Sequence, residues 1–370
     1  MSNQTGIPGP ILARPKIAMS TKGTLGWLRA NLFSNWWNAL LTVLALWLIV
    51  SYLPPLIDWL FISAHWGAAD RQVCFDDRSG ACWSMIHEKY RLILFGRYTY
   101  AEQWRPLVAI LLVICTIAVS CRRKHWSRKL IYLWAFTLTA FLALMFGGFL
   151  GLSYIETSLW GGLPLTLVLS IFGMVAGFPI AILLALGRRS HMPAIKAVCV
   201  GYIELIRGVP LITLLFMASF MLPLFLPTGV SINELLRAQV AIIMFVSAYV
   251  AEVIRGGLQA LPKGQFEAAA AMGLGYWQTT RKIIMPQAIR LVIPPIVNTF
   301  IGMFKDTSLV AIVGLTDLLL AARQAIADPE WRFAFIEAYL FIALIYFCFC
   351  FFMSKYSQYL EYELYGRTTH

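Results

Sequence analysis

The feature that most constrains this chain is a series of long apolar segments with few charges. A helix needs about 20 mostly apolar residues to cross the hydrocarbon core of a bilayer. Eight windows meet or approach this requirement, namely 38–61, 107–120, 130–151, 162–186, 209–227, 235–254, 291–314 and 333–353. The windows are continuously apolar instead of alternating at every second residue, so they indicate helices and not barrel strands. The sequence therefore predicts an all-α integral membrane protein with about eight transmembrane helices.

Composition excludes the main soluble classes. Only 13% of the residues are charged and 59% are hydrophobic, whereas soluble proteins have about 25% charged residues. The chain is too apolar to be disordered, and seven cysteines in 370 residues are too few for a disulfide scaffold. The net charge of +12 is not taken as a sign of nucleic-acid binding, because in a membrane protein Lys and Arg first report orientation.

Lys and Arg concentrate in alternate connections between the predicted spans. The basic connections are 1–37, 121–129, 187–208 and 255–290, and those without Lys or Arg are 152–161 and 228–234. Because cytoplasmic loops carry the excess of Lys and Arg, the basic group is expected inside, together with the N and C termini. Loop 62–106 is expected outside although it has six Lys or Arg, since it also has five acids and the rule weakens in long loops.

These spans suggest a chain in several parts. We expect a cytoplasmic tail at 1–37, three extra transmembrane helices at 38–151, a second group of spans at 160–357 and a cytoplasmic C-terminal tail at 358–370. The first 25 or so residues are rich in Pro, Gly, Ser and Thr, which predicts a mobile segment. No apolar signal-peptide core precedes residue 38, so no cleavable signal is expected.

Two of the cysteines differ from the rest. Cys74 and Cys82 flank a turn-rich stretch of the predicted external loop, and an oxidising compartment outside the membrane permits a disulfide between them. Free thiols at both positions are the alternative. The other five cysteines lie in or beside spans and are interpreted as packing residues. The histidines are scattered and no Cys/His set has ligand spacing, so no metal site is expected.

The connection 255–290 is expected to contain two short helices outside the membrane. The first is alanine-rich, spans 265–272 and ends at Gly273, because glycine readily adopts the left-handed conformation that terminates helices. The second spans 276–284 and is expected to end at Pro286. An alanine face on the first helix allows another protein surface to approach closely.

The spacing of residues in this connection resembles the EAA loop of ABC importer permeases, which reads EAA-x3-G-x9-I-x-L-P. The matching residues are Glu267, Ala268, Ala269, Gly273, Ile283 and Pro286. Met285 stands where the family usually has Leu, which keeps the position apolar.

Three further blocks, 202–210, 251–257 and 305–309, resemble segments of the polar amino-acid permeases. With its extra N-terminal spans, the chain is most similar to the M-type permease of the general L-amino-acid transporters of Gram-negative bacteria. The resemblance extends over 160–357 and implies the five-helix core of a type I ABC importer permease in a bacterial inner membrane.

The resemblance also implies partners. The EAA loop is expected to dock in a groove of an ABC ATPase dimer, which binds ATP and Mg. This chain has no G-x-x-x-x-G-K-[ST] phosphate loop, so no cofactor and no catalytic residues of its own are expected. A periplasmic amino-acid-binding protein would deliver the substrate. A second homologous permease, which we expect to form a heterodimer with this chain, would complete the path, with a second copy of the chain as the alternative.

Ionisable residues in or near spans predict the substrate path, because such groups are costly in a membrane. Asp306 is the expected acceptor for the ammonium group of an amino acid, assisted by Thr307 and Ser308. Glu204 and Arg207 lie one helical turn apart at the mouth of the fifth predicted span, and Arg207 can bind a carboxylate through two hydrogen bonds.

The alternative is that these charged residues are structural pairs, Glu204 with Arg207 and Lys305 with Asp306. For Glu252 and Arg255, at the cytoplasmic end of the sixth predicted span, we expect a structural or coupling role.

Two other function classes remain as alternatives. An ion-driven secondary carrier or channel acting alone predicts internal repeats, which the sequence does not show, and no large loop for a motor. An integral-membrane enzyme would need a nucleophile, a metal cluster or an acid/base pair in the spans, and none is visible.

Overall fold

A computed structural model describes residues 23–67, 71–76, 79–149 and 151–365. Within these ranges the regular elements are all helices, and an isolated bridge joins Gly162 and Asp317. Seven of the described helices are long and apolar enough to cross a membrane, and the number is eight if a bent pair counts as one span. The prediction of an all-α membrane protein with about eight spans is confirmed. The expected mobile segment 1–25 lies largely outside the described residues.

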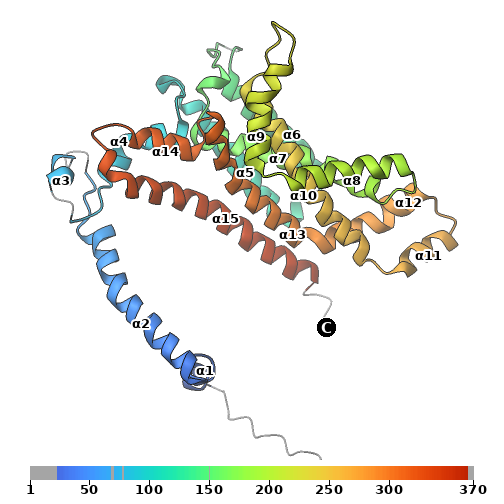
Figure 1. Cartoon of the computed structure of the whole chain (residues 1–370), viewed down its shortest axis with the longest axis horizontal. Coiled ribbons are helices and arrows are strands. Elements are labelled where there is room, and N and C mark those ends of the chain that lie inside the picture. Colours follow the sequence, from blue (N-terminus) through green and yellow to red (C-terminus); the bar gives the residue numbers. More distant parts are fainter. Residues whose placement is uncertain (1–22, 68–70, 77–78, 150, 366–370) are drawn as a thin grey trace, which may run out of the picture. The chain divides into compact units, whose positions relative to one another are not determined.

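Figure 1 shows the order of the helices along the chain. The long helices are α2 (Trp36–Ile57), α5 (Trp104–Ser120), α6 (Arg128–Phe146), α7 (Gly162–Arg188), α10 (Glu234–Ala260), α13 (Met285–Asp306) and α15 (Phe335–Tyr365). The shorter helices are α1 (Thr24–Asn31), α3 (Arg71–Asp76), α4 (Ser84–Phe95), α8 (Pro193–Gly208), α9 (Leu211–Phe216), α11 (Lys263–Ala271), α12 (Tyr276–Thr279) and α14 (Leu318–Ile326). Helix α15 thus continues through most of the segment that was expected to be a tail.

The chain divides into two compact units, and the division differs from the one suggested by composition. The first unit comprises the described residues up to His65 together with 79–81 and Asp76, and the second comprises the remainder. The first unit contains α1 and α2. None of the residues in the apolar window of α2 is buried, so its apolar side chains are free to face lipid. Helices α5 and α6 belong to the same compact unit as the later spans.

The second unit is built around the close packing of α7 against α10. A Cβ atom on Gly173 would lie 2.6 Å from Cγ2 of Ile242, and one on Gly177 would lie 2.8 Å from Cγ1 of Val246. Carbon atoms do not approach this closely, so glycine at these two positions allows the two helices to pack. The shared interface is lined by buried aliphatic residues of both helices.

The fifth predicted span, 209–227, begins at a sharp bend in the chain. Helix α8 and the helical segment Leu211–Phe225 meet at an angle of 102°. The break lies at Val209, whose backbone is extended (φ −112°, ψ 133°), directly before Pro210. Proline disfavours the helical conformation in the preceding residue, and it has no N–H group to continue the helix.

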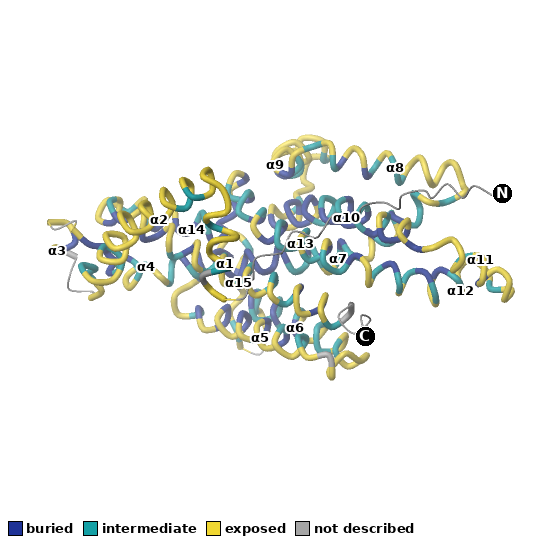
Figure 2. The backbone as a smooth tube through the Cα atoms, turned by 90° about the horizontal axis from the view of Figure 1, so that it is seen from below, coloured by how far each residue is buried: buried dark blue, intermediate teal, exposed yellow. Residues whose placement is uncertain are grey.

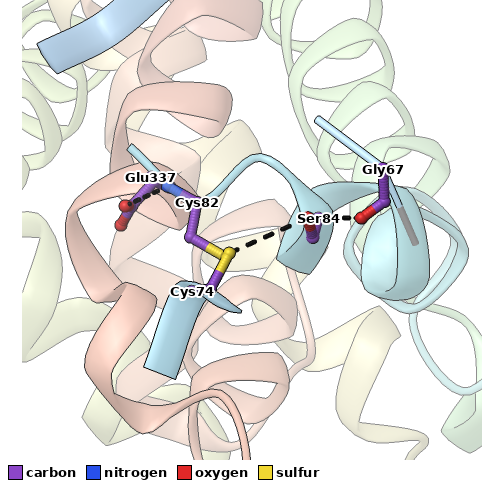
Figure 3. Close-up of a disulfide and its surroundings, with 5 residues drawn as sticks. All are labelled: Gly67, Cys74, Cys82, Ser84 and Glu337. Atoms are coloured by element: carbon purple, nitrogen blue, oxygen red, sulfur yellow. Dashed lines mark hydrogen bonds between the residues drawn. A yellow bond between two sulfur atoms is a disulfide. The ribbon is translucent and has the colours of Figure 1, made fainter. Parts of the chain in front are cut away.

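The predicted external loop is folded and attached to the later spans. A disulfide joins Cys74 and Cys82, and the Cys82 N–H donates to Oε1 of Glu337 on α15 at 2.8 Å (Figure 3). Lys89 of α4 forms an ion pair of 2.8 Å with Asp328, between α14 and α15. Burial lowers the pKa of Lys89, but its hydrogen bonds to Asp328 and Glu88 outweigh that effect and raise the pKa overall.

The second unit has two distinct ends. Helix α4 lies at one end and α11 with α12 at the other, with α7, α10 and α13 running between them (Figure 2). This arrangement agrees with the prediction that loop 62–106 and loop 255–290 lie on opposite sides of the membrane.

Candidate functional site

The first candidate site is the connection that begins with α11. At the end of α11 the Gly273 N–H donates to the Ala270 carbonyl (2.9 Å) and the Leu274 N–H donates to the Ala269 carbonyl (3.1 Å). Gly273 is in the left-handed region, with φ +71°. These two hydrogen bonds and the positive φ are the Schellman arrangement that ends a helix, so the glycine in the EAA spacing is required by backbone geometry.

The surface of this connection is unusually apolar for an exposed segment. Ala269 is buried against the rest of the chain, while Glu267 and Ala268 are exposed. On the two sides of Gly273, Met272 before it and Tyr276 and Trp277 after it are 77%, 57% and 69% exposed. Large exposed apolar side chains that cluster in this way are typical of protein interaction sites.

The connection is attached to the ends of two spans. Arg189, which follows α7, donates from Nη1 to the Leu258 carbonyl on α10 at 2.9 Å. Its guanidinium carbon lies 5.7 Å from the ring centroid of Phe266 on α11. A displacement of α11 can therefore be passed to both α7 and α10 through one side chain.

The expectation that Pro286 ends a second short helix is wrong. Helix α12, a π-helical turn at Thr280–Ile284 and α13 form one continuous helical segment, with Pro286 in the first turn of α13. In the widened turn the Met285 N–H donates to the Thr280 carbonyl, five residues back. This shift in the hydrogen-bond pattern leaves a place for a residue without an N–H group, and proline is well tolerated in a first helical turn. Ile283 and Pro286 therefore belong to the cytoplasmic extension of a membrane span.

The second candidate site is a cluster of five charged residues that joins three helices, which we call the charge cluster. Its members are Arg188 of α7, Glu204 and Arg207 of α8, and Glu252 and Arg255 of α10. Arg188 Nη1 lies 2.9 Å from Glu204 Oε1 and 3.3 Å from Glu252 Oε2. Glu252 also accepts two hydrogen bonds from Arg255, at 2.6 and 3.0 Å.

This geometry changes the pairing expected from sequence. Glu204 pairs with Arg188 and, within the described part of the chain, forms no ion pair with Arg207. Arg207 lies 3.9 Å from Glu252 and 5.5 Å from the ring centroid of Tyr249. Arg188 was missed because it is distant in sequence from α8 and α10. The signal that could have found it is a second basic residue at the end of an otherwise apolar span.

The predicted substrate residues near the end of α13 are in different environments. Thr307 is fully buried, and its hydroxyl donates to the Phe304 carbonyl at 2.7 Å. Asp306 and Ser308 are partly exposed and Lys305 is exposed. The structure gives the Asp306 carboxylate no hydrogen bond or ion pair with a residue that it describes. A partly exposed, unpaired carboxylate at this depth is available to bind a cation.

A large hollow lies elsewhere, between α9 and the first half of α10. It has a volume of about 680 Å³ and apolar walls, and the predicted substrate residues do not line it. Arg237, which was not expected from sequence, is 9% exposed at its edge and donates to the Ser219 carbonyl.

Asp317 is a further buried acid that sequence reasoning missed. It caps α14, where its carboxylate accepts hydrogen bonds from the Leu319 and Leu320 N–H groups at 3.1 and 2.9 Å. Burial raises the pKa of Asp317 to about 6, although these two hydrogen bonds act in the opposite direction. The signal in the sequence is an Asp directly before an apolar helical run, which is a favourable N-cap position.

Comparison with known proteins agrees with this geometry. Residues 177–361 match the family described as binding-protein-dependent transport system inner membrane component. The chain is 51% identical over 348 residues to the inner membrane amino-acid ABC transporter permease protein YhdY of Escherichia coli K12, covering 93% of this chain and 94% of that protein. It is 37% identical to the glutamate/glutamine/aspartate/asparagine transport system permease protein BztC of Rhodobacter capsulatus, covering 98% and 99%.

A solved structure has a similar fold. It is described as the crystal structure of an amino acid ABC transporter with histidines, and it is 35% identical, with a TM-score of 0.50. The match covers 55% of this chain and 92% of that chain. Close to half of this chain therefore lies outside the match.

Proposed function

This chain belongs to the family of binding-protein-dependent transport system inner membrane components, and on that premise we propose that it forms one half of an amino-acid import path. It is a multi-pass protein of the inner membrane and a permease subunit of an ABC importer. The names of its relatives support amino acids as the substrate class, and we propose the L-enantiomers. As a transport component it would carry out no chemical step itself.

The observation that carries this proposal is the α11–α12 connection. Its residues have the spacing of the EAA loop, its glycine has the required left-handed backbone, and its exposed apolar side chains are Met272, Tyr276 and Trp277. We assign the docking of an ATPase dimer to this surface, with ATP and Mg bound by that partner. Arg189 supports this role because it connects α11 with the ends of two spans.

Three further elements complete the proposal. A binding protein would deliver the amino acid at the end of the second unit that carries the disulfide. A second, homologous permease would form a heterodimer with this chain and line the other half of the path. Asp306 is proposed to bind the substrate ammonium group, with Ser308 beside it, whereas the burial of Thr307 favours a supporting role.

The charge cluster is proposed to serve coupling in place of substrate binding. Arg188 and Arg255 each hold a glutamate carboxylate, so among the three arginines only Arg207, 3.9 Å from Glu252, has capacity for an amino-acid carboxylate. Arg188 is the last residue of α7, and Glu252 and Arg255 lie in the last third of α10, so these members are close to the ends of the two helices that Arg189 connects with α11.

The test is reconstitution. Proteoliposomes containing this chain, its second permease and its ATPase, supplied with the binding protein outside and ATP inside, should accumulate labelled L-amino acids only when all components are present. Gradient-driven uptake by this chain alone, with no response to ATP, would instead support the ion-driven carrier.

A further inference from the structure

A second hollow lies where α14 ends and α15 begins. It has a volume of about 400 Å³, and its lining residues are Arg323, Ile326, Ala327, Arg332, Phe335 and Tyr339. Helix α14 and the start of α15, which line the hollow, are at the end of the second unit that also carries α4 and the disulfide (Figure 1). This end is on the predicted external side.

The two arginines at this hollow have no protein counter-charge. Both are exposed, and neither guanidinium makes a hydrogen bond or an ion pair with any residue in the described ranges. Two of the nearby acids are engaged by other groups, since Asp328 forms an ion pair with Lys89 and the buried Glu337 accepts the Cys82 N–H. A third acid, Glu330, is exposed and lies two residues before Arg332. The hollow therefore has two positive charges available for an anionic ligand.

The position of Arg332 fixes the depth of these charges in the membrane. Arg332 directly precedes the apolar run 333–353, which crosses the bilayer as part of α15. Because the hydrocarbon core is about 30 Å thick and needs about 20 helical residues, the beginning of this run marks the hydrocarbon boundary. Arg332 then lies at the level of the lipid headgroups.

An apolar surface continues from the hollow along α15. Phe335 and Tyr339 lie one turn apart on the same face of the helix and are 49% and 40% exposed. Aromatic side chains with this exposure are favoured at the membrane interface. A ligand that places an anionic group on the arginines could lay a hydrocarbon chain along this surface.

We propose that the hollow between α14 and α15 binds one anionic phospholipid of the outer leaflet, with its phosphate on Arg323 and Arg332 and an acyl chain along Phe335 and Tyr339. The lipid would hold α14 against the start of α15 at the external side. This role does not depend on the transported substrate. A free phosphate could bind the two arginines, but it has no acyl chain to cover Phe335 and Tyr339. An acidic patch on a protein partner could also bind the arginines, but such binding does not require them to lie at the level of the lipid headgroups.

The experiment compares lipid retention by the complete transporter complex. The purified complex is incorporated in nanodiscs of phosphatidylethanolamine with a minor fraction of phosphatidylglycerol, and its bound lipids are counted by native mass spectrometry after release. We expect one phosphatidylglycerol per chain to be retained. The double variant Arg323→Gln/Arg332→Gln should reduce this retention about tenfold, because each basic residue near a lipid surface contributes substantially to anionic lipid binding.

Two controls make the result specific. Arg97→Gln removes another exposed arginine near α4 and should leave lipid retention unchanged, and sn-glycerol 3-phosphate at millimolar concentration should not displace the lipid. Equal phosphatidylglycerol retention by the double variant would overturn the proposal. Displacement of the lipid by sn-glycerol 3-phosphate alone would also overturn it. The same holds if the double variant keeps its lipid but no longer docks the binding protein.

Discussion

Arg188 at the end of α7 pairs with Glu204 of α8, with Nη1 and Oε1 2.9 Å apart. The two residues lie on separate helices, and Arg188 also approaches Glu252 on α10. One guanidinium thus connects three helices at the end where the coupling connection begins. A cluster of this kind stabilises the positions of the three helices relative to one another. Because its members interact, single and paired substitutions should be compared to measure the coupling between them.

We predict that substitutions in the charge cluster are not additive. Arg188→Gln and Glu252→Gln should each lower the melting temperature of the purified complex, and the double variant should lose less than the sum. The side chains are each 22% exposed, so solvent screening limits the expected coupling to about 1 kcal/mol. Lys196→Gln, an exposed change on α8, is the matched control. Strict additivity would show that Arg188 and Glu252 act independently.

Gly273→Val should weaken docking of the ATPase. The left-handed φ of +71° costs about 1–2 kcal/mol for a residue with a Cβ, although a Cβ at this position meets no other atom within 4 Å. The cost therefore comes from the backbone and not from a clash. Co-purification of the ATPase and ATP-driven uptake are the measurements.

Two neighbouring changes sharpen this test. Gly273→Asn should be milder than Gly273→Val, because Asn tolerates the left-handed region. Gly275→Ala should have little effect, since Gly275 has φ −69° and open space around it. If all three variants dock the ATPase equally well, the glycine turn is not needed for coupling.

Asp306→Asn should reduce uptake about tenfold while leaving complex assembly intact, as expected for the loss of about 1.4 kcal/mol of substrate interaction. Asp306→Glu keeps the charge and should retain more activity. The measurement is the initial rate of amino-acid uptake in proteoliposomes, with the complex quantified by gel filtration. Unchanged uptake by Asp306→Asn would assign this carboxylate a structural role.

The pH dependence of stability should contain a contribution from Asp317. Its folded pKa is about 6 and its ordinary value is 3.8, so the folded state favours the protonated carboxyl group. This stabilisation is complete below the ordinary pKa and is lost as the pH rises through the folded pKa. Lowering the pH from 7 to 5 should therefore stabilise the protein through this group by about 1 kcal/mol.

The variant Asp317→Asn isolates this contribution. Asn is also a favourable N-cap residue, so α14 should remain capped while the titration is removed. Melting temperatures of wild type and variant measured from pH 5 to 7.5 should diverge as the pH falls. Parallel curves over this range would contradict a raised pKa for Asp317.

Replacing both disulfide cysteines, Cys74→Ser/Cys82→Ser, should lower stability by about 2–3 kcal/mol, because the bond restricts a short loop in the unfolded chain. The linked peptide should appear in non-reducing mass spectrometry of the wild-type protein. Cys199→Ser, at a free cysteine, is the control. Free thiols at Cys74 and Cys82 in protein isolated without reductant would refute the bridge.

Local features of the sequence were sufficient for part of the candidate site. The position of Gly273 after an alanine-rich stretch predicted a helix end, and the hydrogen bonds from Gly273 and Leu274 form that end. The reasoning failed at Pro286, because the rule that proline ends a helix takes no account of the π-helical turn Thr280–Ile284 that precedes α13. Whether such a turn forms depends on packing with other segments, and here Ile284 and Ala288 are both buried.

Pairings between distant segments were not predictable in the same way. Glu204 and Arg207 are one turn apart on α8, which made their pairing the natural expectation, yet Glu204 pairs with Arg188 and Arg207 approaches Glu252. The bend at Val209 and Pro210 determines where α8 lies, and so which charges it meets. A single sequence gives the residues at a bend but not the direction in which the helix continues.

By itself the sequence determined the features whose physics is local or set by the bilayer. These are the all-helical class, since unsatisfied backbone groups are too costly in lipid, the approximate spans, and the EAA spacing in loop 255–290. Only the tertiary structure decided the features that depend on contacts between distant segments. They include the charge cluster around Arg188, the attachment of Cys82 to Glu337 and the unpaired arginines of α14 and α15. An ion pair or an unpaired charge depends on a few ångströms of separation, which the packing of whole helices determines.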